Sequence, residues 1–184
     1  FEPFQPSHEE NNPEGAKSNI SRHYDLSNEL FSLFLDETMT YSSANFAGER
    51  PNFDGLAKAQ IRKIEGILDY AGVKAGMRIL EIGTGWGQLA MQAAYRGAKV
   101  HSITLSKEQK AFADARIAKA GLSNLIDIEL RDYRDLQDEY DAVVSVEMIE
   151  AVGEKYWQVY FDSIIKHLKR GGKFGLQAIT MPHD

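Results

Sequence analysis

A glycine-rich turn is the segment of this sequence whose residue types and spacing are best suited to chemistry. Glycines stand at positions 83, 85 and 87, directly after an apolar run that ends at Ile82. Residues without a Cβ let the backbone approach a ligand closely, and the N–H groups of a helix that begins there attract polar ligand groups. The G-x-G-x-x-G pattern of dinucleotide-binding enzymes is not met, because Gln88 takes the third position. The turn predicts a nucleotide-type ligand.

The next apolar run along the chain is also followed by polar side chains. It ends at Thr104-Leu105-Ser106 without the acid that often binds ribose hydroxyls at this place in nucleotide-binding sheets. Glu108 and Gln109 come next, and either side chain could reach a ribose. Ser106 and Gln109 also have the spacing of a helix capping box. A ribose contact and a cap both stay open for Gln109.

Acidic residues follow the third and fourth apolar runs. After the third, Asp132 could accept a hydrogen bond from an adenine amine while Tyr133 covers the base. The alternative is a solvated acid beside a half-buried tyrosine. Glu147 and Glu150 follow the fourth run, at the sheet edge where open α/β folds bind ligands. There a carboxylate could favour a cationic ligand, position a base, or only complement a helix N-terminus.

The elements that must position these residues alternate between strand and helix, which predicts an α/β fold with a parallel sheet covered on both faces. Short apolar, partly β-branched runs predict strands at 77–82, 98–104, 125–130, 142–146 and 173–180. Helices are expected between them at 88–96, 107–120 and 154–169, closed by Gly97, Gly121 and Gly171-Gly172 as C-caps. Apolar spacing predicts two earlier helices, at 27–36 with Ser27 as N-cap and at 56–70.

These elements divide the chain into three parts. Residues 1–18 show no apolar periodicity and are expected to be a flexible lead-in. Residues 19–76 are expected to form a helical cap that contributes to the ligand pocket. Residues 77–184 are expected to form the Rossmann-like core.

Composition excludes several functions. The 184 residues suit one domain, with 43% hydrophobic and 26% charged residues. The absence of cysteine excludes disulfides, thiolate metal sites and cysteine nucleophiles, and no metal site is predicted. A net charge of -6 argues against nucleic acid as a partner. No apolar run approaches the roughly 20 residues that span a bilayer. We expect a cytoplasmic protein with at most peripheral contact at the inner membrane face.

The glycine turn matches the E/D-x-G-x-G-x-G loop of class I methyltransferases, and longer segments narrow the resemblance. Nearly everything after residue 19 resembles the cyclopropane fatty acid synthase family, which includes the mycolic acid cyclopropane and methyl-modifying enzymes. The likeness rests on His23 to Asn28, on 34–36 and 39–44, on the glycine turn with Trp86, on 105–109 and on 150–153. Because this architecture usually adds two more strands, the chain is expected to be truncated after its fifth strand.

The resemblance implies S-adenosylmethionine as cofactor. The implied contacts are Tyr41, Ser42, Gly83, Gly85, Thr104, Leu105 and Gln109, with adenine near Asp132 and Tyr133. Glu81 and Gly87, at the two ends of the loop, are assigned to the same binding site.

The resemblance also implies a substrate, an unsaturated acyl chain of a phospholipid at the membrane surface. In the family an alkene takes the methyl group, and the resulting carbocation loses a proton to a bound bicarbonate; Glu150 would belong to that bicarbonate pocket. Two departures affect the same pocket, because Ser43 and Gln177 replace a cysteine and a histidine of many members. Glu150, Ser43 and Gln177 are therefore the catalytic candidates, and a ring, a methylene or a methyl-branched product stays open.

The resulting prediction is a lipid C-methyltransferase. Two alternatives stay open: a small-molecule O- or N-methyltransferase, and a cofactor-binding subunit that needs a partner. A homo-oligomer is a further open option.

Overall fold

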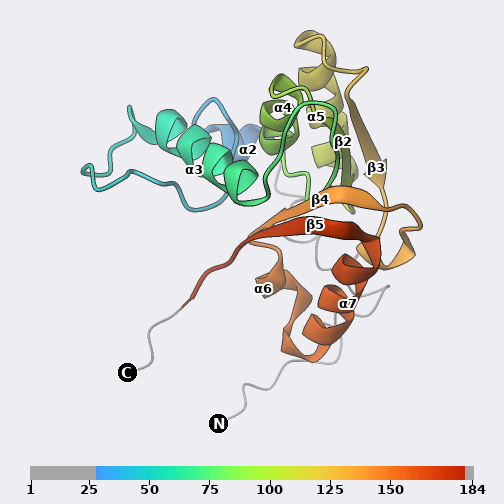
Figure 1. Ribbon diagram of the computed structural model, residues 1–184. Helices are drawn as coiled ribbons and strands as arrows, with labels where there is room; N and C mark the ends of the chain where they lie inside the picture. Colours follow the sequence, from blue (N-terminus) through green and yellow to red (C-terminus); the bar gives the residue numbers. More distant parts are fainter. Residues whose placement is uncertain (1–27, 181–184) are drawn as a thin grey trace, which may run out of the picture.

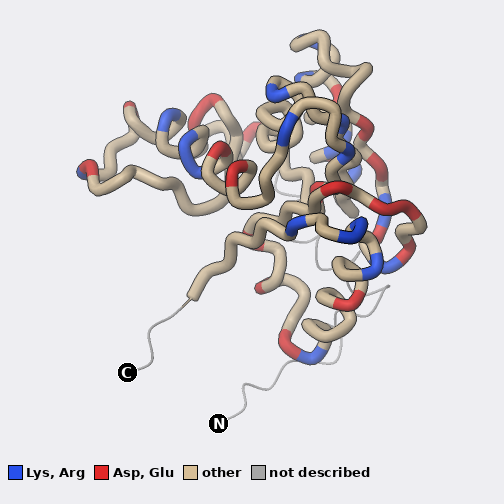
Figure 2. The backbone as a smooth tube through the Cα atoms, in the orientation of Figure 1, with Lys and Arg blue, Asp and Glu red and all other residues tan. Residues whose placement is uncertain are grey.

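The computed structural model describes residues 28–180 of the chain (Figure 1). The expected lead-in at 1–18, the N-cap Ser27 and most of the segment from His23 to Asn28 lie outside this range. Between residues 28 and 180, no helix is long and apolar enough to cross a membrane, and no group of three potential metal-ligating side chains is found. Acidic and basic residues are both scattered over the described backbone in Figure 2.

The centre of the fold is a parallel sheet in the order β3-β2-β1-β4-β5. Its strands are β1 (Arg78–Ile82), β2 (Lys99–Thr104), β3 (Ile126–Leu130), β4 (Tyr140–Val146) and β5 (Leu168–Gln177). At its end, β1 pairs Ile82 with Ile103 of β2 and with Ser145 of β4. The carboxyl ends of these three strands therefore meet at one edge, which confirms the expected α/β sheet.

Helices cover both faces of the sheet (Figure 1). One face packs against α3 (Leu56–Tyr70), α4 (Gln88–Tyr95) and α5 (Lys107–Lys119), through an apolar cluster that includes Leu68, Ile79 and Val144. The other packs against α7 (Trp157–His167), through Leu80, Tyr140 and Tyr160. Shorter elements are α2 (Asn28–Ser32), α6 (Ile149–Val152) and the 3₁₀ turns η2 (Tyr133–Asp135) and η3 (Glu154–Tyr156).

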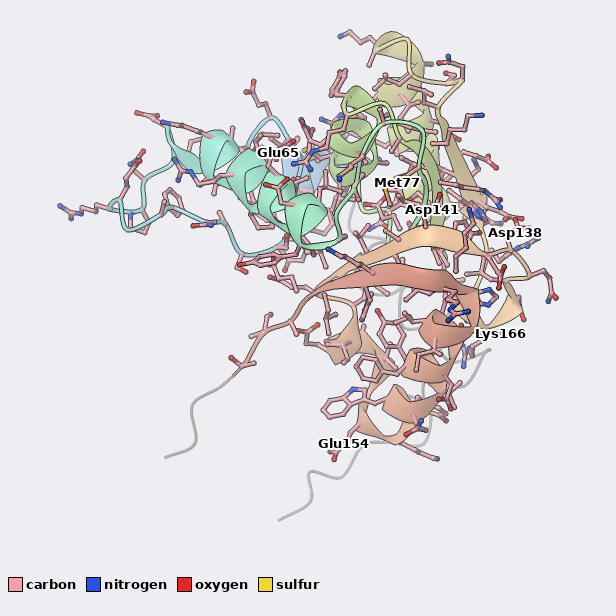
Figure 3. All side chains as sticks on the ribbon, viewed as in Figure 1. Glu65, Met77, Asp138, Asp141, Glu154 and Lys166 are labelled. Atoms are coloured by element: carbon pink, nitrogen blue, oxygen red, sulfur yellow. The ribbon has the colours of Figure 1, made fainter. Side chains whose placement is uncertain are left out.

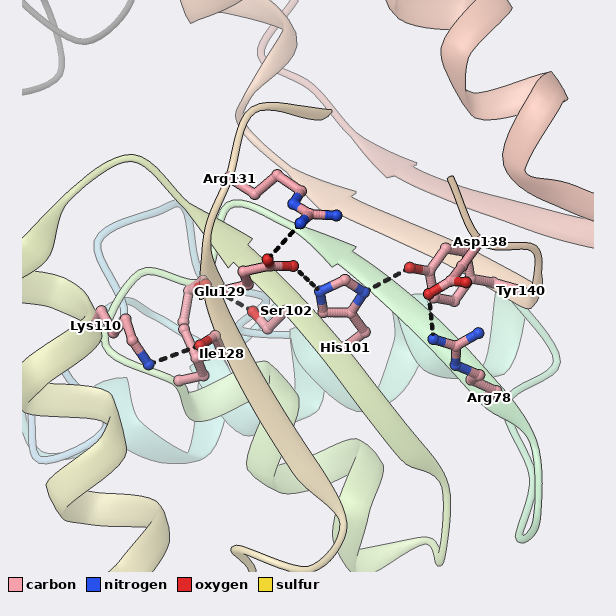
Figure 4. Close-up of polar contacts among 10 residues, drawn as sticks. Arg78, His101, Ser102, Lys110, Ile128, Glu129, Arg131, Asp138 and Tyr140 are labelled. Atoms are coloured by element: carbon pink, nitrogen blue, oxygen red, sulfur yellow. Dashed lines mark hydrogen bonds and ion pairs between the residues drawn. The ribbon is translucent and has the colours of Figure 1, made fainter. Parts of the chain in front are cut away.

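A polar network ties four strands together on the face that carries α7 (Figure 4). His101 of β2 lies between the Tyr140 hydroxyl of β4, at 2.5 Å, and the Glu129 carboxylate of β3, at 3.1 Å. Arg78 of β1 stacks over the Tyr140 ring, 4.9 Å from its centroid, and donates a 2.6 Å hydrogen bond to Asp138. Since each partner comes from a different segment, the network helps to fix the strand register.

Charged side chains also hold the other face and the amino edge of the sheet. Arg96, at the end of α4, binds Glu65 of α3 and donates a 2.7 Å hydrogen bond to Asp69. Asp141 accepts a 2.7 Å hydrogen bond from the backbone of Arg78. Glu65 and Asp141 are labelled in Figure 3, on α3 and at the start of β4. The contacts of Arg96 position α3, which forms one wall of the site described below.

The last strand corrects one expectation. Gly171-Gly172 does not cap a helix, because α7 ends at His167 and the next residue, Leu168, is already extended. The glycines lie inside β5, where the register against β4 is irregular. A Cβ on Gly172 would lie 2.9 Å from the Lys169 carbonyl and 3.0 Å from that of Asp141. Gly172 therefore allows the backbone of β5 to lie close to these two carbonyls. The strand begins at 168 instead of the predicted 173.

The first described helix is shorter than expected. The apolar spacing predicts a helix over 27–36, but α2 ends at Ser32. Tighter i to i+3 backbone hydrogen bonds, from Leu33 to Leu30 and from Phe34 to Phe31, end it. The chain then turns toward the glycine-rich segment.

Candidate functional site

A pocket opens at the carboxyl edge of the sheet. Its walls come from segments that are far apart in the sequence: 39–42, Lys63 and Ile64 of α3, 81–86, 103–105, 131–134, and 146–148 with 151–152. This is the edge at which open α/β sheets bind ligands. Ten of the fourteen sequence-predicted site residues line it, all from the prediction for the cofactor: Tyr41, Ser42, Glu81, Gly83, Gly85, Thr104, Leu105, Gln109, Asp132 and Tyr133. Gly87 and the three catalytic candidates do not line it.

 Glu147, which is not among these fourteen, lines the pocket as well.

The glycine turn uses its three glycines in two ways. All three have positive φ, +95° at Gly83, +52° at Gly85 and +88° at Gly87. A Cβ on Gly83 would lie 2.7 Å from the Met148 side chain, whereas one on Gly85 would have no atom of the described residues within 4 Å. Gly87 does not line the pocket, and a Cβ there would lie 3.0 Å from that of Ala113 in α5. Gly83 and Gly85 thus border the ligand space, and Gly87 lets α4 pack on α5.

Glu81 is a buried acid in the pocket wall. The Ser102 hydroxyl donates a 2.5 Å hydrogen bond to it, and Ser102 is in turn 2.7 Å from the Thr84 hydroxyl. Desolvation raises the pKa of Glu81 to about 8, an effect that the Ser102 hydrogen bond opposes. Glu81 is therefore largely protonated at neutral pH, and it can lose its proton when a cation enters the pocket.

Gln109 takes part in the helix cap, and it also lines the pocket. Its backbone N–H donates a 3.2 Å hydrogen bond to the Ser106 hydroxyl, so the helix cap is present. Its side-chain oxygen accepts a 3.0 Å hydrogen bond from Thr104. Within residues 28–180 its amide nitrogen has no partner, and the residue lines the pocket. That nitrogen is free to bind a ligand oxygen.

The segment after β3 places an arginine beside the predicted adenine contacts. Asp132 accepts hydrogen bonds from the backbone and the guanidinium of Arg134, at 3.0 and 2.5 Å among others. Tyr133 packs edge-on against Tyr160, with ring centroids 5.2 Å apart, and burial raises its pKa. The Asp132 carboxylate is thus already paired, while the half-buried Tyr133 ring lines the pocket. An adenine contact for Asp132 stays a prediction.

The wall opposite the glycine turn is held by α3. The Ser42 hydroxyl accepts a hydrogen bond from Lys63, and the Ser42 carbonyl accepts a 2.7 Å hydrogen bond from Gln60. Lys63 is only 7% exposed, and desolvation lowers its pKa to about 8, while the nearby negative charges of Glu147 and Asp36 raise it. Tyr41 lines the same wall, although 56% of its surface is exposed.

Lys63 is a site residue that sequence reasoning missed. A signal for it exists, because Gln60, Lys63, Ile64 and Ile67 follow the i, i+3, i+4, i+7 spacing of one helical face. All four are buried. Two polar residues on an otherwise apolar stripe indicate a buried polar site.

Arg116 of α5 joins the two segments that border the pocket. Its guanidinium donates hydrogen bonds to the carbonyls of Thr38, at 3.0 Å, and Trp86, at 2.9 Å, and to the Gln88 side chain, at 2.7 Å. Trp86 is buried and packs on Phe31, with ring centroids 4.8 Å apart. The segment before Tyr41 is thereby fixed to the glycine turn.

The catalytic candidates do not gather as expected. Ser43 and Gln177 do meet, with the Gln177 amide donating a 3.1 Å hydrogen bond to the Ser43 hydroxyl. The acid between them is Glu147, whose Oε1 lies 2.6 Å from the Ser43 hydroxyl and 2.8 Å from the Gln177 amide. Glu150 is exposed, lies outside the pocket lining and accepts a hydrogen bond from the backbone of Ile179. Its catalytic role stays a prediction, without contact to the other two.

Known proteins resemble this chain over most of its length. The family model described as mycolic acid cyclopropane synthetase matches residues 11–184. The chain is 52% identical over 184 residues to the tuberculostearic acid methyltransferase of Mycobacterium tuberculosis, an alignment that covers 98% of this chain and 43% of that protein. It is 42% identical over 158 residues to the cyclopropane-fatty-acyl-phospholipid synthase of Escherichia coli, covering 85% and 39%. The chain thus spans about two fifths of the length of these relatives.

A solved structure shares the fold. The crystal structure of a mycolic acid cyclopropane synthase complexed with SAH and CTAB matches with a TM-score of 0.77 and 32% identity, over 83% of this chain and 53% of that chain. The expected class I methyltransferase sheet is thereby confirmed. On its sequence and its fold, the chain belongs to the mycolic acid cyclopropane synthetase family.

Proposed function

We propose that this chain is the cofactor-binding part of an S-adenosylmethionine-dependent C-methyltransferase that acts on the double bond of unsaturated fatty acyl chains. The observation that carries the proposal is the pocket at the carboxyl edge of the sheet, which the glycine turn borders on one side and Tyr41 and Ser42 on the other. The names of the relatives support it, since they are a tuberculostearic acid methyltransferase and a cyclopropane-fatty-acyl-phospholipid synthase.

The residues of the pocket fit this cofactor. The open space above Gly85 leaves room for the ligand against the turn. The free amide nitrogen of Gln109 is suited to a ribose oxygen, and the Tyr133 ring to one face of adenine. Glu81 can become an anion near the cationic end of the ligand. The cofactor would supply a methyl group to an alkene carbon, and these residues would hold and orient it.

The surroundings of the pocket suit a lipid. A cluster of Phe31, Met39 and Trp86 forms a buried apolar support beneath the rim, where Tyr41 packs on Phe31 with ring centroids 5.3 Å apart. Exclusion of water matters here, because a carbocation formed from an alkene would otherwise be trapped by it. We further propose that the acyl chain is presented in a phospholipid at a membrane surface, with contact that is peripheral.

Methyl transfer from labelled cofactor tests the proposal. Full-length protein is incubated with methyl-labelled S-adenosylmethionine and vesicles of a mono-unsaturated phosphatidylglycerol, with saturated vesicles as the matched control. We expect label in the acyl chain of the unsaturated lipid only. Label in a soluble oxygen or nitrogen acceptor instead would support a small-molecule methyltransferase. Turnover that requires a second protein would identify a cofactor-binding subunit.

A further inference from the structure

We propose that the carboxylate of Glu147 is the proton acceptor of this reaction and takes the place that a bound bicarbonate would fill. The inference rests on the proposed function, because it assigns the proton that the methylated substrate must lose. It starts from a contact between three distant segments: the end of β4, the end of β5 and the segment before α3.

The hydrogen bonds around Glu147 carry the argument. One oxygen, Oε1, accepts from the Ser43 backbone at 2.9 Å, from the Ser43 hydroxyl at 2.6 Å and from the Gln177 amide at 2.8 Å. Within residues 28–180, the other oxygen, Oε2, has no hydrogen-bond partner. One oxygen is therefore anchored, and the other is free to take a proton.

Bicarbonate does not fit the same place. The donors that would hold a small oxyanion, those of Ser43 and Gln177, already bind the carboxylate of the chain. A second anion would have to displace Glu147 or lie against its negative charge, and like charges at contact disfavour each other. The side chain of Glu147 supplies the same functional group, a carboxylate with a free oxygen.

The backbone holds Glu147 in this position. Its φ is +50°, a left-handed conformation that residues other than glycine adopt rarely. Such conformations persist where the surroundings impose them, and they concentrate at functional sites. The backbone N–H of Glu147 donates a 2.8 Å hydrogen bond to the Gln177 carbonyl, which fixes the end of β4 to the end of β5. The half-buried side chain lines the pocket beside Met148.

A buried lysine, Lys63, lies close enough to Glu147 for the two charges to interact. Lys63 is buried, and the charge of Glu147 is the largest of the electrostatic effects that raise its pKa. Lys63 also donates a hydrogen bond to Ser42, the neighbour of Ser43. Lys63 and Glu147 thus belong to one polar cluster, joined through Ser42 and Ser43.

The proposed step is balanced without any further reagent. After methyl transfer, the substrate carries a positive charge on the carbon next to the newly bonded one. A C–H bond beside that charge breaks; its electron pair forms a C=C bond, or closes a three-membered ring if the hydrogen comes from the transferred methyl group. The proton goes to Oε2 of Glu147, which becomes a neutral carboxylic acid and later releases the proton to water. No oxidant or reductant is consumed.

The test compares substitutions in the full-length protein, with the labelled-lipid assay as readout. Glu147→Gln keeps the shape and a hydrogen-bond-accepting oxygen but cannot take the proton, so we expect turnover to fall by about 100-fold while cofactor affinity changes less than about threefold. Glu154→Gln is the matched control, because Glu154 is exposed and lies outside the pocket lining (Figure 3). Circular dichroism and calorimetry establish folding and cofactor binding of each variant.

A second measurement separates a base from a structural acid. Wild-type turnover in buffer freed of carbon dioxide should equal that with added bicarbonate. Glu147→Gly, which exposes the donors of Ser43 and Gln177, should be inactive in bicarbonate-free buffer and regain activity with bicarbonate or formate. Wild-type activity that depends on bicarbonate would overturn the inference.

The remaining outcomes are distinct. If wild type labels the lipid and Glu147→Gln does so within about threefold, the proton acceptor is another group and the proposed function stands. A large loss in Glu150→Gln combined with an active Glu147→Gln would give the role to Glu150. If wild type labels no lipid, the proposed function fails, and the inference fails with it.

Discussion

At the scale of single residues, the charge state of Glu81 has a measurable effect on stability. Its pKa is raised from 4.5 to about 8 by burial, so the folded protein binds more protons than the unfolded chain between these values. The contribution of Glu81 to the free energy of unfolding therefore falls as pH rises through this window. Glu81→Gln should remove this part of the pH dependence and be more stable than wild type above pH 8. Urea unfolding at a series of pH values measures it; parallel pH profiles for the two proteins would contradict the assignment.

Glu81 is also expected to release a proton when the cofactor binds. A sulfonium near Glu81 favours the carboxylate, so binding of S-adenosylmethionine at pH 7 should release a proton from this group. Calorimetry in two buffers of different ionisation enthalpy detects the release, and Glu81→Gln should abolish it. Equal observed enthalpies in the two buffers for wild type would show that Glu81 does not titrate on binding.

Gly85 tests whether the turn touches the ligand. A methyl group there meets no atom of residues 28–180, so its cost within this part of the chain comes from the positive φ of +52°. We expect Gly85→Ala to weaken cofactor binding by about 1 to 3 kcal/mol. Isothermal titration provides the affinity. An unchanged affinity would mean that the glycine serves the turn alone.

At the scale of elements, the contact between α3 and β5 depends on one glycine. A Cβ on Gly175 would lie 3.1 Å from the Ile67 side chain and 3.2 Å from its carbonyl. Gly175→Ala should therefore lower the free energy of unfolding by about 1 to 3 kcal/mol. Gly66→Ala is the control within α3, since its Cβ has open space and alanine favours a helix by about 1 kcal/mol. Chemical denaturation should move the two variants in opposite directions.

The sequence predicts the elements well where the pattern is local. The β-branched runs around Ile79, Val100 and Val143 indicate strands because both faces of a parallel sheet are buried. The prediction of Gly171-Gly172 as a helix cap is wrong, because a glycine after a helical pattern resembles a cap in the sequence. The close approach of Gly172 to the Asp141 carbonyl of β4 is visible only in the structure. The contact of Glu147 with Ser43 and Gln177 could not be predicted for a similar reason. A glutamate gives no signal of a left-handed φ, and that conformation decides which acid faces the pocket.

At the scale of the whole molecule, the pocket joins the segment at 39–42 and α3 to the edge of the sheet. A ligand bound there stabilises all of these parts together, by about 2.7 kcal/mol at a concentration of 100 times its Kd. We expect S-adenosylmethionine to raise the melting temperature and to slow amide hydrogen exchange both at 39–43 and at 83–87. Protection confined to the glycine turn would place the ligand away from Tyr41 and Ser42.

The central position of β1 bears on how the protein folds. This strand pairs with β2, which follows it closely, but also with β4, whose residues lie some 60 positions later: Ile82 pairs with Ser145. Contacts of such long sequence separation form slowly, because the intervening chain must close before they yield any stabilisation. The floor of the pocket cannot exist until that closure. During refolding, the capacity to bind cofactor should therefore return together with the slowest structural phase, and a stretch of β1 without its second neighbour would be exposed to aggregation until then.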